Sequence, residues 1–175
     1  MSRCFHSQSM FVVVTVLTGL PMAMAADFSP DSVQFAPGYE HTFEAQYGAR
    51  EVPTLRSEIA QTVSQSLKAA HGSCRLDLNV VVDRAAPTHP TMKQQSDEPG
   101  LDPIRTVYRN GGAALTGRVL GSDGKVLATV THRYFSDTLP PISPARDPWS
   151  EARVAISQFS SKLVEACEQK SGEQR

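Results

Sequence analysis

Two segments of this chain carry apolar residues at helical spacing along one face only, and this pair restricts the fold more than any other feature. The first, residues 53–71, opens with Pro at a first-turn position and closes at Gly72. Its apolar stripe recurs every fourth residue: Leu55, Ile59, Val63 and Leu67. The second begins at Asp147 and Pro148, an N-cap residue followed by a first-turn Pro. Its stripe is Trp149, Ala152, Ile156, Phe159, Leu163 and Ala166 or Cys167.

The segments around these helices alternate apolar and polar residues, which is the period of a β-strand. Residues 76–83 alternate and contain three adjacent valines. Residues 113–120 and 125–135 predict two strands, joined by an Asp-Gly turn at residues 121–124 that suits a tight hairpin. Residues 39–47 alternate too, which predicts a further strand: Tyr39, His41, Phe43 and Ala45 against Glu40, Thr42 and Glu44.

These elements predict an α+β fold in the order β-α-β-β-β-α. A helix with one apolar face must cover an apolar surface, so we expect a two-layer sandwich. In it, two helices pack on one face of a small mixed or antiparallel sheet. Residues 26–175 are enough for a single domain with its own core, and 26–38 form an extended N-terminal segment.

Residues 1–25 have the order of a cleavable secretory signal peptide. Arg3 is followed by an apolar run from Met10 to Leu20 and by small residues that predict cleavage after Ala25. The run is about half the length that a helix needs to cross a bilayer, so we expect no stable membrane anchor. Cys4 precedes the run, whereas a lipoprotein signal places its cysteine after it. The sequence therefore predicts a soluble protein that is periplasmic or secreted.

The net charge narrows the classes of partner that the chain could bind. The whole chain has a formal net charge of −1. Because a nucleic-acid partner calls for a basic face, we expect no nucleic-acid partner.

Only Cys74 and Cys167 follow the signal peptide, and in an oxidising compartment they pair most simply as one disulfide. If the two helices lie parallel, Cys167 reaches the end of the sheet where Cys74 begins a strand.

Residues 84–112 are rich in Pro and Gly and predict a long loop, with one short strand candidate at 104–108. A long irregular connection inside a compact domain is often functional, because the Pro and Gly residues fix polar side chains in place. The candidate binding residues on it are His89, Met92, Asp102 and Tyr108. The structural alternative is a rigid loop that covers an edge of the sheet.

The sequence lacks the common catalytic and metal-binding motifs. It has no Gly-x-Ser-x-Gly elbow and no His-Glu-x-x-His helix. His41 and Glu44 form one close pair of possible metal ligands, but on a strand positions three apart point to opposite faces. We therefore expect no catalytic residues, no metal and no cofactor.

Export, near-neutral charge and the lack of catalytic motifs favour a non-catalytic module that binds an envelope protein partner or contributes to envelope assembly. The alternative is a small-molecule-binding protein or a small hydrolase whose site is built by residues 84–112. A preformed polar pocket under that loop would favour the alternative. An exposed apolar patch of several hundred Å² would favour the protein partner. The sequence leaves the oligomeric state open.

Several short motifs resemble those of a family of small exported bacterial domains of unknown function. They are Leu-Arg-x-Glu-Ile at 55–59, Pro-Thr-Met with a following Gln at 90–94, Pro-Gly-Leu-Asp at 99–102, Gly-Gly-Ala at 111–113 and the segment from Trp149 through Ala152. The resemblance implies an envelope module with a strand-helix-strand-hairpin-helix order. It implies no catalytic residues, and a shared fold does not give the function.

Overall fold

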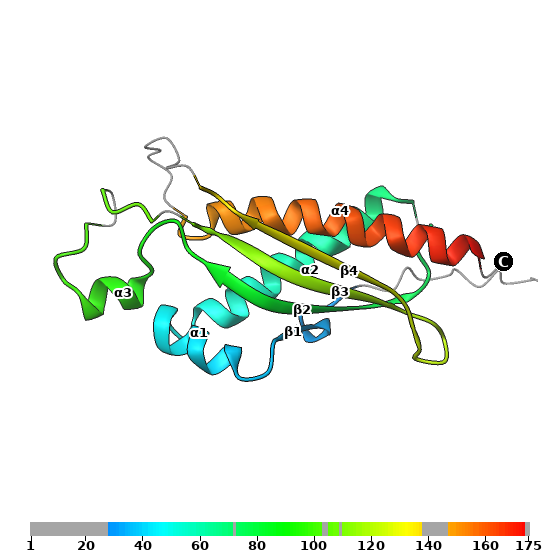
Figure 1. Ribbon diagram of the computed structural model, residues 1–175, viewed down its shortest axis with the longest axis horizontal. Helices are drawn as coiled ribbons and strands as arrows, with labels where there is room; N and C mark the ends of the chain where they lie inside the picture. Colours follow the sequence, from blue (N-terminus) through cyan, green and yellow to red (C-terminus); the bar gives the residue numbers. More distant parts are fainter. Residues whose placement is uncertain (1–27, 72, 103–104, 109, 138–146, 174–175) are drawn as a thin grey trace, which may run out of the picture.

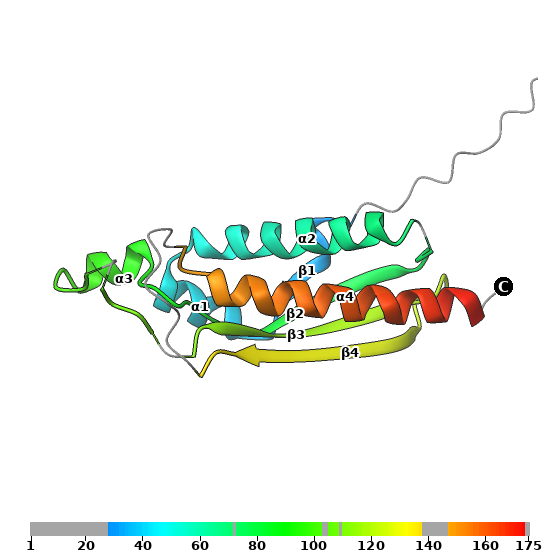
Figure 2. The ribbon, with the colours of Figure 1, turned by 90° about the horizontal axis from the view of Figure 1, so that it is seen from above.

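Two helices cover one face of a four-stranded sheet in the computed structural model, which describes residues 28–71, 73–102, 105–108, 110–137 and 147–173 (Figure 1). The strands are β1 (Val33–Phe35), β2 (Asp77–Ala86), β3 (Gly112–Leu120) and β4 (Val126–Phe135). The helices are the 3₁₀ turn η1 (Pro30–Ser32), α1 (Tyr39–Tyr47), α2 (Glu51–Ala69), α3 (Met92–Asp97) and α4 (Ser150–Glu173). α2 and α4 form one layer and the sheet forms the other (Figure 2). The α+β fold predicted from the sequence is confirmed, and the predicted signal peptide lies outside the described residues.

The sheet is mixed, and its strand order follows the chain, β1-β2-β3-β4. β1 is parallel to β2, with Val33 opposite Val80, whereas β2, β3 and β4 are antiparallel to their neighbours. The register of β2 against β3 shifts at Asp83, which is the mark of a β-bulge. β1 and η1 lie within the segment 26–38, which is therefore not merely extended. Among the described residues, none of the helices is long and apolar enough to cross a membrane.

The apolar stripes of α2 and α4 face the sheet and form most of the core with it, as their spacing predicts. Gly117, in the middle of β3, lies directly beneath α4. A Cβ atom added to it would stand 2.7 Å from Leu163 Cδ1 and 2.8 Å from Phe159 Cζ. The missing side chain of Gly117 therefore allows α4 to approach the sheet closely.

Residues 39–47 form helix α1, so the prediction of a strand there is wrong. The Phe43 side chain is fully buried, with its ring centroid 5.1 Å from that of Phe35 and 5.4 Å from that of Trp149. His41, on which the alternating pattern partly rested, is exposed. On a helix, residues four apart share a face, and the aromatic residues have this spacing: Tyr39, Phe43 and Tyr47. The packing of these rings against the core stabilises the helix over a strand.

Residues 84–112 contain less loop than the sequence predicts. The two ends of this range belong to β2 and β3, and α3 occupies part of its interior. A capping box begins α3: Thr91 Oγ1 accepts from Gln94 N (3.4 Å) and Gln94 Oε1 accepts from Thr91 N (3.0 Å). The described part of the short strand candidate, residues 105–108, forms no strand. The described part of this segment therefore contains strand residues at both ends and one short helix in its interior.

Cys74 and Cys167 form the predicted disulfide, with their Cα atoms 5.3 Å apart. α2 and α4 run parallel, so the chain that leaves α2 meets the last turns of α4 at the same end of the molecule (Figure 2). Cys167 is fully buried and Cys74 is half-buried. The bond therefore joins the segment before β2 to the final helix from inside the core.

Candidate functional site

The chain between β2 and α3 is held against the body of the fold, and it contributes residues to two of the hollows at this end of the molecule. The Thr88 backbone N donates to the Pro148 carbonyl oxygen (2.7 Å), and the Tyr108 backbone N donates to the Thr88 carbonyl oxygen (2.7 Å). The other side of α3 lies against Gly48. A Cβ atom on Gly48 would lie only 3.2 Å from Lys93 Cβ, and its φ of 108° is one that other residues rarely adopt, so glycine suits this close contact. This end of the molecule is therefore preformed.

The larger hollow, which we call the tryptophan hollow, has a volume of about 450 Å³ and lies where α2 and α4 begin. Its walls include Glu51, Asp147 and Trp149. The Trp149 Nε1–H donates to Glu51 Oε2 (2.6 Å), and the Asp147 carboxylate pairs with Arg153. Both carboxylates of these walls are therefore already occupied within the protein.

Two of the predicted binding residues, His89 and Met92, lie in the walls of the tryptophan hollow. His89 is buried, and its Nδ1 lies 3.3 Å from the Thr106 carbonyl oxygen. A carbonyl oxygen only accepts, so His89 Nδ1 carries the proton of this hydrogen bond. Met92 stands at the rim with 68% of its surface exposed. The structure thus gives His89 a role in fixing the chain and leaves Met92 open to solvent.

No metal centre is formed in the part of the chain that the structure describes, where no three His, Cys, Asp or Glu side chains come together. His41 and Glu44 lie on helix α1 rather than on a strand. The opposite-face reason for rejecting that pair is therefore wrong.

The smaller hollow, which we call the arginine hollow, has a volume of about 280 Å³. It lies between the end of α1, the end of β2 and the start of α3. Its polar side chains are Gln46, Tyr47, Arg84, Gln94, Tyr108 and Asn110, and Ala86 and Pro87 complete the lining. Since the capping box occupies Gln94 Oε1, the side-chain NH₂ group of Gln94 is left to face a ligand as a donor.

The two phenols of the arginine hollow are hydrogen-bond donors at neutral pH. Burial raises the pKa of Tyr47 to about 12, and the neighbouring Tyr39 adds to the shift while the Arg84 charge opposes it. The pKa of Tyr108 is raised as well, first by burial and then by the negative charge of Glu98. Both hydroxyl groups therefore keep their protons and can donate to an acceptor in the hollow.

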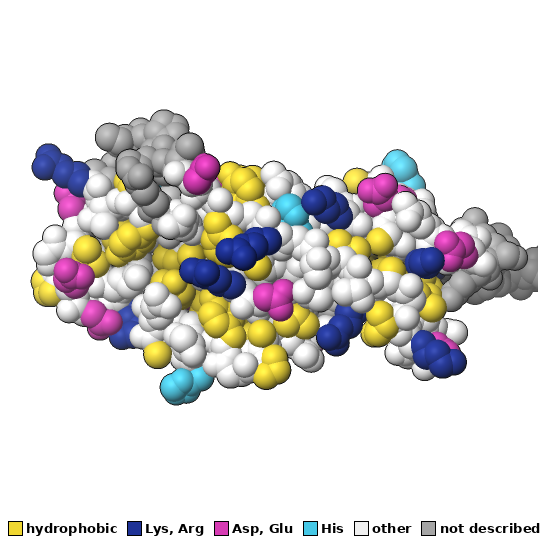
Figure 3. Space-filling model, in the orientation of Figure 1, with side chains coloured by type: hydrophobic (Ala, Val, Ile, Leu, Met, Phe, Trp, Pro, Cys, Tyr) yellow, Lys and Arg dark blue, Asp and Glu magenta, His cyan; other side chains and the backbone are white. Residues whose placement is uncertain are grey.

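Arg84 brings a positive charge to the arginine hollow. Its guanidinium carbon lies 5.3 Å from the centroid of the Phe135 ring, and that of Arg133 lies 5.4 Å from the same centroid. The two arginines flank Ala114 in one row across the sheet. Within the described residues, neither guanidinium has a carboxylate oxygen within 4.0 Å. Figure 3 shows this face, with Lys and Arg side chains near its centre among hydrophobic ones.

The four predicted binding residues are divided among three places. His89 and Met92 share the tryptophan hollow, and Tyr108 lines the arginine hollow. Asp102 lines neither hollow; its carboxylate accepts from Arg105 N (3.2 Å) in an exposed turn. The structure therefore does not assemble the predicted four-residue site.

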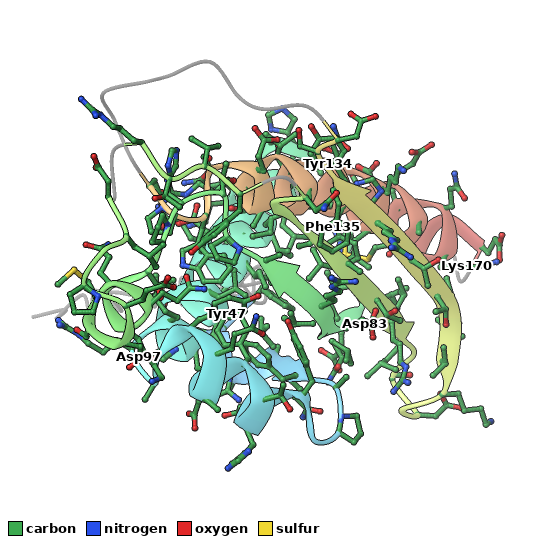
Figure 4. All side chains as sticks on the ribbon, turned by 60° about the vertical axis from the view of Figure 1, so that its left-hand side comes forward. Tyr47, Asp83, Asp97, Tyr134, Phe135 and Lys170 are labelled. Atoms are coloured by element: carbon green, nitrogen blue, oxygen red, sulfur yellow. A yellow bond between two sulfur atoms is a disulfide. The ribbon has the colours of Figure 1, made fainter. Side chains whose placement is uncertain are left out.

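Sequence reasoning missed Tyr47, Arg84 and Gln94 as site residues. Figure 4 brings this end of the molecule forward, with Tyr47 labelled on α1 and Phe135 on β4. The Thr91-x-x-Gln94 capping signature is visible in the sequence and fixes one wall. No local pattern brings Tyr47 to the end of β2, because that contact depends on α1 being a helix.

The lining of the arginine hollow offers hydrogen-bond donors and a positive charge. Its described residues offer no Ser, Cys, His, Lys or carboxylate that could serve as a nucleophile or general base. The phenol of Tyr47 is too weak an acid to form a phenolate at neutral pH. The polar groups of the lining therefore include hydrogen-bond donors beside the guanidinium of Arg84.

No family model, no curated protein and no solved structure matches this chain. The resemblance to small exported bacterial domains stays a prediction.

Proposed function

We propose that this protein is an exported, non-catalytic module that binds a small anionic ligand in the arginine hollow. The observation that carries the proposal is Arg84, whose charge has no carboxylate partner among the described residues and faces a hollow lined by donors. A carboxylate or phosphate group can accept from a guanidinium in bidentate fashion and from the two phenols at the same time. The volume of about 280 Å³ fits a ligand of only a few carbon atoms.

The surface favours this ligand over an envelope protein partner. Large hydrophobic side chains that are exposed in the described residues are Met92, Val126 and Val154, and they lie in three different elements, α3, β4 and α4. Scattered apolar residues of this kind are normal on a monomeric protein. A partner protein therefore stays a prediction, and the preformed polar hollow supports the small-molecule alternative.

Replacing Arg84 should remove most of the binding. We expect succinate, citrate or inorganic phosphate to bind the processed protein in isothermal titration calorimetry, and glucose to give no heat. In Arg84→Gln the affinity should fall at least tenfold, because a hydrogen bond to a charged group contributes about 1.5–3 kcal/mol.

Arg118→Gln is the matched control for this experiment. Like Arg84, Arg118 lies on the face of the sheet away from α4. It is exposed and has no ion pair among the described residues, but it lies outside the arginine hollow and the tryptophan hollow. Its replacement should leave the affinity unchanged. If none of the three anions binds, or if both variants weaken binding equally, the arginine hollow is not the site.

Export is supported by the disulfide, since such bonds persist in oxidising compartments. When the full chain is expressed in a bacterial host, we expect the periplasmic fraction to contain a protein that begins at Ala26. Intact-mass measurement gives the answer directly. A mass that keeps residues 1–25, or one that includes an added acyl chain, would contradict the proposal.

A further inference from the structure

A second arginine lies beside the arginine hollow without being part of its lining. One row of residues across the sheet runs from Arg84 on β2 through Ala114 on β3 to Arg133 on β4. The next row on the same face runs from Ala86, which lines the hollow, to Phe135. Arg133 therefore faces the same side of the sheet as Arg84, across β3 from it.

The Phe135 ring brings the two guanidinium groups together. The guanidinium carbons of Arg84 and Arg133 lie 5.3 Å and 5.4 Å from the centroid of this ring. A guanidinium contacts an aromatic ring through its face and donates hydrogen bonds in its own plane, so these contacts leave N–H groups available. Both side chains are exposed, and Figure 3 shows basic side chains near the middle of this face with hydrophobic ones around them.

The acids that are nearest in the chain do not pair with these two arginines. Asp83 Oδ2 accepts from Thr116 Oγ1 (2.7 Å), and Asp137 is exposed after the end of β4. The ion pairs within the described ranges involve neither Arg84 nor Arg133. Two positive charges held at one ring repel each other, and a bound anion offsets this repulsion. The pair of arginines therefore favours a negatively charged ligand that reaches both.

We propose that the ligand of the arginine hollow is a small dicarboxylate that binds both arginines. This inference rests on the function proposed above and specifies the class of ligand. One carboxylate lies in the hollow and accepts hydrogen bonds from Arg84, Tyr47 and Tyr108. The second lies outside the hollow and pairs with Arg133. A carboxylate accepts two parallel hydrogen bonds from one guanidinium, so each arginine holds one end of the ligand.

The surface between the two arginines suits a hydrocarbon chain. Ala114 separates Arg84 from Arg133 in their row, and Ala86 and Pro87 are the apolar residues of the hollow. These side chains are short and carry no polar group. The methylene groups that join two carboxylates can therefore lie on them and lose contact with water, which is favourable for apolar groups.

Glutarate and pentanoate are the matched probes, because their carbon chains have the same length and they differ in one carboxylate. We expect isothermal titration calorimetry to show that the processed protein binds glutarate at least tenfold more tightly, since glutarate adds a hydrogen-bonded ion pair. In Arg133→Gln the affinity for glutarate should fall close to that for pentanoate, and the affinity for pentanoate should stay unchanged. Arg84→Gln should weaken the binding of both probes.

Arg118→Gln is the matched control, because it also removes one exposed positive charge from this face. Arg118 lies four residues from Ala114 along β3, which places it about 13 Å from the row that holds Arg84 and Arg133. This variant should keep the preference for glutarate. If Arg118→Gln and Arg133→Gln lose the preference equally, only the overall charge of the face matters and the inference is overturned.

Nuclear magnetic resonance observes each arginine in the unaltered protein and does not depend on the stability of a variant. The Nε–H signal of Arg133 should shift with glutarate and not with pentanoate, whereas the Arg84 signal should shift with both. Equal affinities for the two probes, or an Arg133 signal that glutarate leaves in place, would overturn the dicarboxylate and leave the proposed anion site intact. If neither probe binds or moves the Arg84 signal, the proposed function fails together with this inference.

Discussion

Replacing Cys74 and Cys167 together by alanine is expected to lower the melting temperature by about 10–20 °C. The bond spans 93 residues, and closure of a loop that long in the unfolded chain stabilises the native state by about 4–5 kcal/mol in the chain-entropy description. For a domain of roughly 150 residues, each kcal/mol shifts the melting temperature by about 2–4 °C. A loss of this size approaches the whole net stability of a small domain.

Calorimetric melting of the processed protein, with and without a reductant, measures this effect. The reduced wild type should melt close to the double variant, since both lack only the bond. Thiol titration of the denatured, unreduced protein is the independent check. Two free thiols per chain would show that the cysteines are not joined.

A side chain at position 117 is expected to destabilise the protein by about 1–3 kcal/mol. In Gly117→Val the new Cβ would stand under 3 Å from Leu163 Cδ1 and Phe159 Cζ, both on the buried face of α4. The helix must then lift from the sheet or its core side chains must leave their preferred rotamers, and either response costs packing. Chemical denaturation gives the free energy of unfolding of the variant.

Ala114→Val is the control for this substitution. Ala114 lies on β3 as Gly117 does, but on the face of the sheet away from α4. There we expect a change within about 0.5 kcal/mol, as for most surface substitutions. If Gly117→Val is as stable as the control, α4 does not pack on β3 as closely as described.

The helices α2 and α4 and the strands β2, β3 and β4 were predictable because each carries its own periodicity. The apolar stripe from Leu55 to Leu67 predicts which side of α2 is buried, and the valines predict that β2 lies in the core. Residues 39–47 were not predictable in this way, since Tyr39 and Phe43 fit both an alternating and a four-residue period. The helix is stabilised by a contact between residues distant in sequence, because the Trp149 ring stacks on the Phe43 ring.

The candidate site was predictable only in its general location. Tyr108 and other residues of 84–112 line the arginine hollow, but Gln46 and Tyr47 of α1 line it as well. The charge in that hollow comes from Arg84, which reads in the sequence as an ordinary residue at the end of a strand. Its significance depends on which acids lie near it in space, and sequence spacing carries no such information.

The parallel pairing of β1 with β2 has a consequence for the order in which the protein folds. Val33 meets Val80 only after the chain between them, with both α1 and α2, has been closed into a loop, whereas β3 and β4 meet across a short turn. Contacts between distant residues form slowly, so we expect the hairpin and α4 to organise first and β1 last. A chain exported as proposed here would deliver these parts in the opposite order. Its first helices would then wait with their apolar faces uncovered, a state that a holding chaperone of the envelope is suited to protect.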